Sequence, residues 1–155
     1  MRLRRSWREK LEKAPAPKIV RIPPKMQKRL GKGTMLIPSP LDVDARIREA
    51  GRGRLVTQPQ IRGDLARACG ADVACPITTG IFLRIAAEAA EEDRRAGKKR
   101  VTPYWRVVRD DGSLIEKFPG GVEAQAARLI AEGHAIEPGR GSRPPRVKGF
   151  RGTGG

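Results

Sequence analysis

Residues able to support catalysis or metal binding are few in this sequence of 155 residues. It holds two cysteines, Cys69 and Cys75, and a single histidine, His134. A structural zinc site takes four ligands of these types, and a disulfide framework takes more cysteines, so we expect no metal and no other cofactor. The two thiols are expected to pack as small buried hydrophobic side chains. Low cysteine usage also favours a reducing, cytoplasmic compartment.

Cationic side chains, in contrast, are abundant, and their chemistry is the neutralisation of phosphates. Lysine and arginine number 33 against 17 acidic residues, which gives a net charge of +16 and a pI near 11.1. Residues 1–34 carry +10 and residues 138–155 carry +5, whereas residues 35–137 carry only +1. Charge of one sign that is segregated in this way predicts a polyanionic partner, either double-stranded DNA or RNA. Solubility alone, or docking on an acidic protein, would also account for it.

Composition divides the chain into three parts that must position these cations. Residues 1–34 form a basic, proline-rich arm, in which Trp7 and Leu11 are spaced for one helical turn. Residues 35–137 are expected to form the folded domain, and residues 138–155 a disordered tail rich in Gly, Arg and Pro. No apolar run approaches the ~18–20 residues that cross a bilayer, and no apolar segment follows the basic start. We therefore expect neither a membrane protein nor a secretory signal.

The middle part begins with helices whose starts are marked by capping residues. Ser39 and Pro40 predict the start of one helix, and Thr57 and Gln60 have capping-box spacing at the start of the next. A third helix is expected over 76–96. The apolar residues that recur there every four positions are Ile77, Ile81, Ile85 and Ala89.

These elements predict a fold class. The second and third helices, joined by a short glycine-containing turn, are typical of a helix-turn-helix. Residues 100–118 then predict a β-hairpin with its turn at Asp110-Asp111-Gly112, and residues 121–133 predict a closing helix. The chain is therefore expected to be α+β and mainly helical. It would form a winged-helix-like domain, with a helix-turn-helix, a β-hairpin wing and basic arms at both ends.

Three segments occur in an order that resembles one protein family. GRLVTQPQI, TPYWRVVRDDGSL and FPGGVEAQAARLIAEGH look like the DNA-binding domain of the O6-alkylguanine-DNA alkyltransferases, over roughly residues 41–136. That family carries a Pro-Cys-His-Arg-Val motif, and here Pro103 matches its proline while Tyr104 and Trp105 stand at its cysteine and histidine. Alkyl transfer requires a thiolate and a histidine base, which a phenol and an indole do not replace at neutral pH. We therefore expect no enzyme activity; residual chemistry at Cys75 or Tyr104 is the competing hypothesis.

The resemblance implies the alkyltransferase-like subgroup, whose members lack the cysteine, bind alkylated DNA without repairing it and flag the lesion for repair proteins. Two family side chains are replaced here. Ile77 stands at an arginine that fills the gap left by an extruded base, and Gln58 stands at a tyrosine that helps to rotate the nucleotide. Pro103, Tyr104 and Trp105 are the candidates for a base pocket. Tyr104 and Trp105 would either stack on an extruded base or pack in the core.

DNA contacts are expected at the N-terminal turn of the 76–96 helix and on the wing. The candidate DNA-binding residues are Gln58, Ile77, Thr78, Thr79, Arg84, Arg106 and Arg109. We therefore predict a non-enzymatic DNA-binding protein that senses alkylated guanine in double-stranded DNA for repair. The alternative is a general architectural nucleic-acid binder, of DNA or RNA, without lesion selectivity. Either protein would act in the cytoplasm, and at the nucleoid if the source is bacterial.

Overall fold

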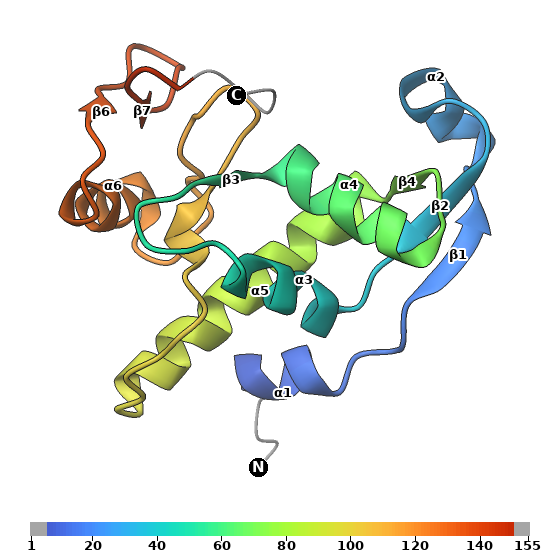
Figure 1. Cartoon of the computed structure of the whole chain (residues 1–155), viewed down its shortest axis with the longest axis horizontal. Coiled ribbons are helices and arrows are strands. Elements are labelled where there is room, and N and C mark those ends of the chain that lie inside the picture. Colours follow the sequence, from blue (N-terminus) through green and yellow to red (C-terminus); the bar gives the residue numbers. More distant parts are fainter. Residues whose placement is uncertain (1–5, 151–155) are drawn as a thin grey trace.

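The protein has an α+β fold that is mainly helical, as the sequence predicts; its structure is a computed structural model that describes residues 6–150. Figure 1 shows one long helix, α5, at the centre, with shorter helices around it and short strands toward the edges. In chain order the elements are α1 (Trp7–Glu12), β1 (Lys18–Arg21), the 3-10 helix η1 (Pro24–Met26), α2 (Gln27–Leu30), β2 (Thr34–Ile37), α3 (Pro40–Arg48), β3 (Val56–Thr57), α4 (Gln58–Cys69), β4 (Val73–Ala74), α5 (Pro76–Arg95), the 3-10 helix η2 (Tyr104–Arg106), β5 (Val107–Val108), α6 (Gly121–Ala131), β6 (Ile136–Glu137) and β7 (Arg146–Val147).

The starts of α3 and α4 depend on the capping side chains that the sequence indicates. Ser39 Oγ accepts a hydrogen bond from the Asp42 N–H at 3.2 Å. Thr57 and Gln60 form a complete capping box, because each side chain accepts the backbone N–H of the other, at 3.1 and 2.8 Å. Gly70, at φ +74°, ends α4 in the left-handed conformation. These local contacts determine where the helix pair α4–α5 begins and where it turns.

The largest hydrophobic core lies where α5 packs against α1 and α3. α5 contributes small side chains to it; Ala86, Ala87, Ala89 and Ala90 are all fully buried. Because alanine carries only a methyl group, neighbouring backbones approach α5 closely, and larger side chains such as Leu11 of α1 and Ile47 of α3 fill the remaining space. The second half of the central helix is therefore closely packed.

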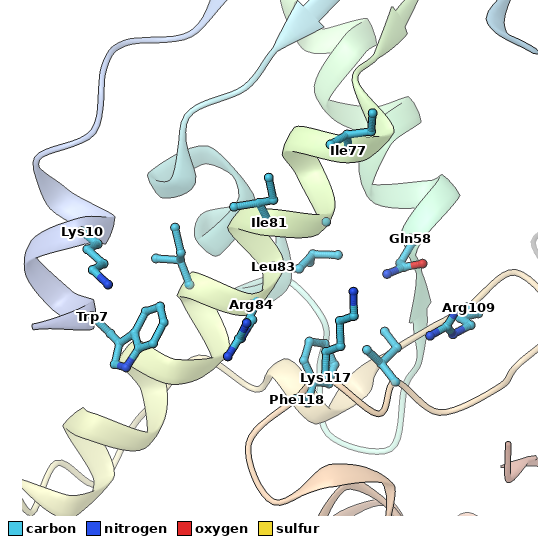
Figure 2. Close-up of a pocket in the computed structure, with 13 residues that line it drawn as sticks. Trp7, Lys10, Gln58, Ile77, Ile81, Leu83, Arg84, Arg109, Lys117 and Phe118 are labelled. Carbon is cyan, nitrogen blue, oxygen red and sulfur yellow. The ribbon is translucent and has the colours of Figure 1, made fainter. Parts of the chain in front are cut away.

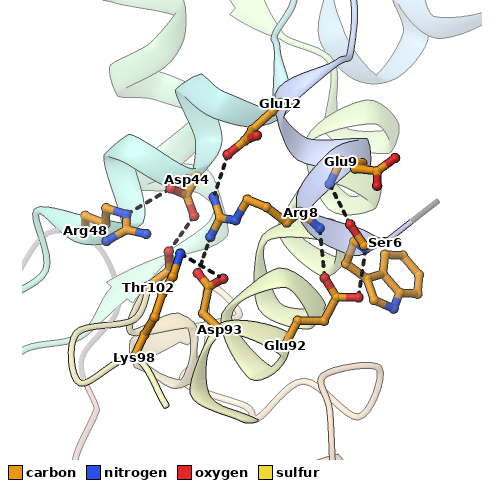
Figure 3. Close-up of polar contacts among 11 residues, drawn as sticks. Ser6, Arg8, Glu9, Glu12, Asp44, Arg48, Glu92, Asp93, Lys98 and Thr102 are labelled. Carbon is orange, nitrogen blue, oxygen red and sulfur yellow. Dashed lines mark hydrogen bonds and ion pairs between the residues drawn. The ribbon is translucent and has the colours of Figure 1, made fainter. Parts of the chain in front are cut away.

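The start of the chain, expected to be an arm, folds onto α5 from Trp7 onward. The Glu92 carboxylate accepts hydrogen bonds from the backbone N–H groups of Trp7 and Arg8, both at 3.0 Å. The Arg8 guanidinium pairs with Asp93, and Lys98 lies 3.5 Å from the same carboxylate. Figure 3 shows these contacts between α1 and α5. The helical turn predicted in this segment is present as α1.

Residues 18–37 form a small basic unit, here called the N-terminal lobe, beside the turn between α4 and α5. β1 pairs antiparallel with β2, and β2 pairs parallel with β4, which lies in that turn. The buried side chains of Ile22 and Met35 cluster with Cys75, the residue before α5. In Figure 1 the lobe lies at one end of the molecule and β6 and β7 lie at the opposite end.

The hairpin predicted over 100–118 forms only in part. Its turn is present, with Gly112 at φ +85°. However, β5 has no return strand as its partner and instead pairs parallel with β3. The return segment is bound elsewhere, because the Leu114 N–H donates to the Pro145 carbonyl oxygen at 2.9 Å. The wing is therefore a loop held by C-terminal residues and not a two-stranded hairpin.

The C-terminal tail, expected to be disordered from residue 138, follows a defined path to residue 150. β7 pairs antiparallel with β6, and Val147 is buried with 4% exposure. The Phe150 side chain lies against Gly112, and the Val147 N–H donates to the Gly112 carbonyl oxygen at 3.0 Å. The prediction was wrong for these residues because the wing loop supplies backbone partners that composition does not reveal. Residues 1–5 and 151–155 lie outside the described part of the chain.

Candidate nucleic-acid interface

The outward face of the first half of α5 is apolar. Ile77 is 62% exposed and Ile81, one turn later, is 55% exposed. Gly80 lies between them, with no atom within 4 Å of the position a Cβ would take. Arg84 follows after one further turn, so the first two turns of this face carry no side chain that hydrogen-bonds to base edges. This part of the face can therefore make apolar contacts with a partner, but it cannot form hydrogen bonds that distinguish one base from another.

This face forms one wall of a groove of about 580 Å³, here called the α5 groove. Its other walls come from α1, from the start of α4 and from the segment after β5. Four of the seven predicted DNA-binding residues line it: Gln58, Ile77, Arg84 and Arg109. Figure 2 shows these four around one opening together with Trp7, Lys10, Lys117 and Phe118. The structure thus brings together residues that are far apart in the sequence.

Four cationic side chains lie around the groove, namely Lys10, Arg84, Arg109 and Lys117. Within residues 6–150 none of the four forms an ion pair. The Lys10 ammonium lies 4.2 Å from the centroid of a Trp7 ring, and the Arg84 guanidinium carbon lies 5.9 Å from it. Trp7 therefore helps to hold two cations at one end of the groove. Uncompensated positive charge along a concave surface attracts anions.

Thr78 and Thr79, two of the predicted DNA contacts, do not share the outward face of α5. The Thr78 hydroxyl donates to Cys75 Sγ at 3.3 Å, next to the start of the helix. Thr79 is 1% exposed and lies in the protein interior. The cause is helical periodicity: with Ile77 and Ile81 outward, position 79 falls on the opposite side of the helix. Thr79 is therefore not positioned to contact a duplex, whereas Thr78 is half-buried in the first turn of α5.

Arg106, predicted as a DNA contact on the wing, is instead bound inside the protein. Its Nη2 lies 2.7 Å from Glu132 Oε2, and its Nη1 donates to the Ala50 carbonyl oxygen at 2.6 Å. The exposed fractions of the two paired side chains are only 13% for Arg106 and 6% for Glu132. Burial alone would raise the pKa of Glu132, but hydrogen bonds from Arg106 and from the Trp105 indole outweigh it and lower the pKa. Arg106 is therefore a structural residue in this protein.

The proposed base pocket is filled by its own side chains. Tyr104 is 2% exposed, and its ring makes edge-to-face contacts with Trp105 and Phe118, at centroid separations of 5.4 and 5.2 Å. Pro103 is also buried. Burial, with the negative charge of Glu91 nearby, raises the pKa of Tyr104 to about 12. Of the two alternatives for Tyr104, stacking on a base or packing in the core, this geometry favours packing.

The two cysteines lie in different environments. Cys75 is buried as expected, but Cys69 is exposed, so the prediction of burial was wrong for that thiol. Between residues 6 and 150 there is no group of three or more His, Cys, Asp or Glu side chains arranged to hold a metal ion. No helix in that part of the chain is long and apolar enough to cross a membrane.

Sequence reasoning missed several residues of the groove. Lys10 and Trp7 come from the segment treated as an arm, and Lys117 follows the wing. Ile81 was recognised only as part of an apolar repeat, although its spacing of four from Ile77 places both on one face. A search for an apolar pair followed by arginine at the next turn would have found this face.

Comparisons with known proteins give one structural similarity. No protein-family model matches the chain, and no curated protein matches it significantly. Among solved structures, the chain is similar to S. pombe Atl1, crystallised in complex with damaged DNA containing O6-carboxymethylguanine. The TM-score is 0.47 and the sequence identity 18%, over 70% of this chain and 87% of that chain.

Proposed function

We propose that this protein binds double-stranded DNA without catalysis, through the α5 groove. The observation that carries the proposal is the set of four cations around the groove, which have no ion-pair partner in residues 6–150, beside the exposed pair Ile77 and Ile81. Duplex phosphates would bind the cations and position the protein, while the isoleucines contact sugars or bases within a groove of the DNA.

The residues of the groove also favour binding with little sequence preference. Direct readout of bases requires side chains that donate or accept hydrogen bonds at defined places. On the outward face of α5 only Arg84 meets that requirement, and Gln58 and Arg109 approach from other elements. Most of the affinity would then come from phosphates, and it would fall steeply as the salt concentration rises.

A non-enzymatic role is supported by the state of the residue at the family's cysteine position. With its pKa raised to about 12 by burial and by the charge of Glu91, Tyr104 stays a neutral phenol at physiological pH. A neutral, buried phenol is a poor nucleophile. Trp105 at the histidine position has an indole N–H that donates to Glu132 at 3.1 Å, and an indole does not act as a base.

A second candidate function is the recognition of alkylated guanine for repair proteins. It is favoured by the sequence resemblance and by the apolar side chains deep in the α5 groove, which include Leu83, Ile85, Ile115 and Phe118. A volume of about 580 Å³ is in the range of sites that bind small molecules, so the groove has room for a base with an alkyl group. In this hypothesis the lesion would enter the α5 groove and not the filled space at Tyr104.

Titration of a fluorescent duplex at several salt concentrations tests the main proposal. For the wild-type protein we expect log K to fall linearly with log salt, with a slope of about 0.9 per phosphate contact. The double variant Arg84→Gln/Arg109→Gln removes two cations of the groove, and the slope should decrease by about 1.8. The matched control is Lys99→Gln/Arg100→Gln, which removes two exposed cations beyond the far end of α5.

The outcomes separate the hypotheses. Unchanged binding in the groove variant, or equal losses in the groove and control variants, would contradict the proposal. Stronger binding to structured RNA than to the duplex at the same salt would assign the groove to RNA. Matched duplexes with and without O6-alkylguanine test the second candidate, because a preference for the lesion that is lost in Ile81→Ala, an exposed residue of the groove, and kept in the control, would place the alkylated base in the groove.

A further inference from the structure

The N-terminal lobe carries a dense charge of one sign. Between residues 18 and 37 there are six basic residues and no acidic residue. The six are Lys18, Arg21, Lys25, Lys28, Arg29 and Lys32. None of them forms an ion pair within the described residues 6–150, and all six are exposed. Charge of this density without internal compensation marks a surface that meets an anionic partner.

Backbone hydrogen bonds hold the lobe in a fixed position against the helix pair α4–α5. Met35 and Leu36 of β2 pair with Val73 and Ala74 of β4, and the Cys75 N–H donates to the Leu36 carbonyl oxygen at 2.9 Å. Since Cys75 immediately precedes α5, the lobe lies at the end of α5 that carries Ile77. Its cations are thus presented in a defined direction relative to the α5 groove.

The lobe also contacts α4, because Leu36 of β2 clusters with Ala66 of α4, and α4 carries a further cation, Arg62. Burial lowers the pKa of Arg62 on α4, the Asp110 carboxylate opposes that effect, and the neighbouring cation Arg29 of α2 lowers the pKa further. Arg62 lies one helical turn after Gln58, a residue of the α5 groove. A phosphate bound beside Arg62 and Arg29 would form charge-assisted hydrogen bonds with both guanidinium groups.

We propose that the N-terminal lobe, with Lys28 and Arg29 of α2 and Arg62 of α4, is a second phosphate-binding surface for the same DNA duplex that occupies the α5 groove. The inference rests on the proposed function and extends it. The duplex would continue past the start of α5 onto the lobe, with Arg62 between the two contact surfaces. Because the lobe is folded before binding, its cations lose less conformational freedom on binding than those of a loose arm would.

The test is a matched pair of double variants, each of which neutralises one Lys-Arg dipeptide. Lys28→Gln/Arg29→Gln acts on the lobe, and Lys99→Gln/Arg100→Gln acts on an exposed segment beyond the far end of α5. In duplex titrations at several salt concentrations, we expect the slope of log K against log salt to fall by about 1.8 for the lobe variant. The control slope should stay within error of the wild type. Arg62→Gln should lower the slope by about 0.9.

The possible outcomes distinguish this inference from the proposed function. If the groove variant Arg84→Gln/Arg109→Gln loses binding but the lobe variant matches the control, the second surface is disproved and the groove stands. If the wild-type protein does not bind duplex DNA, both proposals fail. Equal slope changes in the lobe and control variants would mean that DNA affinity depends on the total positive charge of the protein and not on the position of the cations. That result also overturns the inference. Melting temperatures close to the wild-type value show that each variant is folded.

Discussion

The buried position of Tyr104 leads to a prediction that separates packing from base recognition. In the variant Tyr104→Ala, the ring that contacts Trp105 and Phe118 is removed from a site with only 2% exposure. Removing a buried aromatic ring costs about 3–5 kcal/mol, which includes the lost edge-to-face contacts of about 0.5–1.5 kcal/mol each. For a chain of this size, each kcal/mol lowers Tm by roughly 2–4 °C. A loss near 4 kcal/mol therefore lowers Tm by roughly 8–16 °C.

The conservative variant Tyr104→Phe keeps the ring and both aromatic contacts. Its free energy of unfolding is expected to stay within about 1 kcal/mol of the wild-type value. Both variants would be followed by urea unfolding and by thermal melting, and duplex binding would be measured well below the lower Tm. If Tyr104 is a packing residue, Tyr104→Phe binds plain and O6-alkylguanine duplexes as the wild type does.

Two results would refute this reasoning. One is a Tyr104→Ala protein with wild-type stability, because a truly buried ring cannot be removed without cost. The other is a wild-type preference for O6-alkylguanine duplexes that disappears in Tyr104→Phe while stability is unchanged. That second result would return Tyr104 to a base pocket and would mean that DNA binding opens the space it fills.

Two further predictions concern the contacts that hold the wing and the C-terminal segment. Glu132→Gln leaves the Arg106 guanidinium buried without a counter-charge, so urea unfolding should show a loss of about 3 kcal/mol. Burial opposes the lowering of the pKa of Glu132, but hydrogen bonds from Arg106 and Trp105 prevail. The wild-type carboxylate therefore stabilises the fold at pH values above the usual pKa of glutamate. This contribution is lost as the pH falls through the lowered pKa of Glu132. The difference in free energy of unfolding between the wild type and Glu132→Gln should therefore become smaller in acid. Gly112→Ala places a methyl 2.7 Å from Phe150 atoms at φ +85°, and should cost about 1–2 kcal/mol and speed proteolysis between residues 138 and 150. Unchanged cleavage would contradict the C-terminal contact.

The helix pair was predictable because its signals are local. Thr57 and Gln60 are three residues apart, and the hydrogen bonds between them depend only on the start of α4. The same holds for Ser39 at the start of α3 and for Gly70 at the end of α4. Residue type and spacing contain all the information that such contacts need.

The wing and the tail were not predictable because their partners are distant in sequence. Val107 has strand propensity, but its partner is Val56 in a parallel pair, not the residue across the predicted turn. Pro145 accepts a hydrogen bond from Leu114, and this contact orders a segment whose glycine and proline content indicates disorder. Composition reports the tendency of an isolated segment, whereas tertiary contacts decide its state in the fold.

The candidate site also contains residues that the sequence identifies correctly and residues whose role depends on tertiary contacts. Gln58 and Ile77 were identified from the family resemblance, and Arg84 and Arg109 from their places on the expected helix and wing; the groove gathers all four. Arg106 was identified in the same way but is engaged by Glu132, because a charged residue in a motif serves packing as readily as binding. Burial distinguishes the two roles, and it is a property of the whole fold.

The parallel pairing of β2 with β4 has a consequence for folding during translation and for the choice of truncated fragments. During translation, β1 and β2 are synthesised well before Val73 and Ala74. The edge of β2 that later pairs with β4 is therefore unpaired during that time. An uncovered strand edge invites pairing with other chains. A truncated protein that starts at residue 35 would lose β1 and keep most of β2, and so would permanently expose the opposite edge of β2, the one that β1 covers. A soluble fragment for binding studies should therefore begin before Lys18, and it should include α1 if the central helix is to keep its covering.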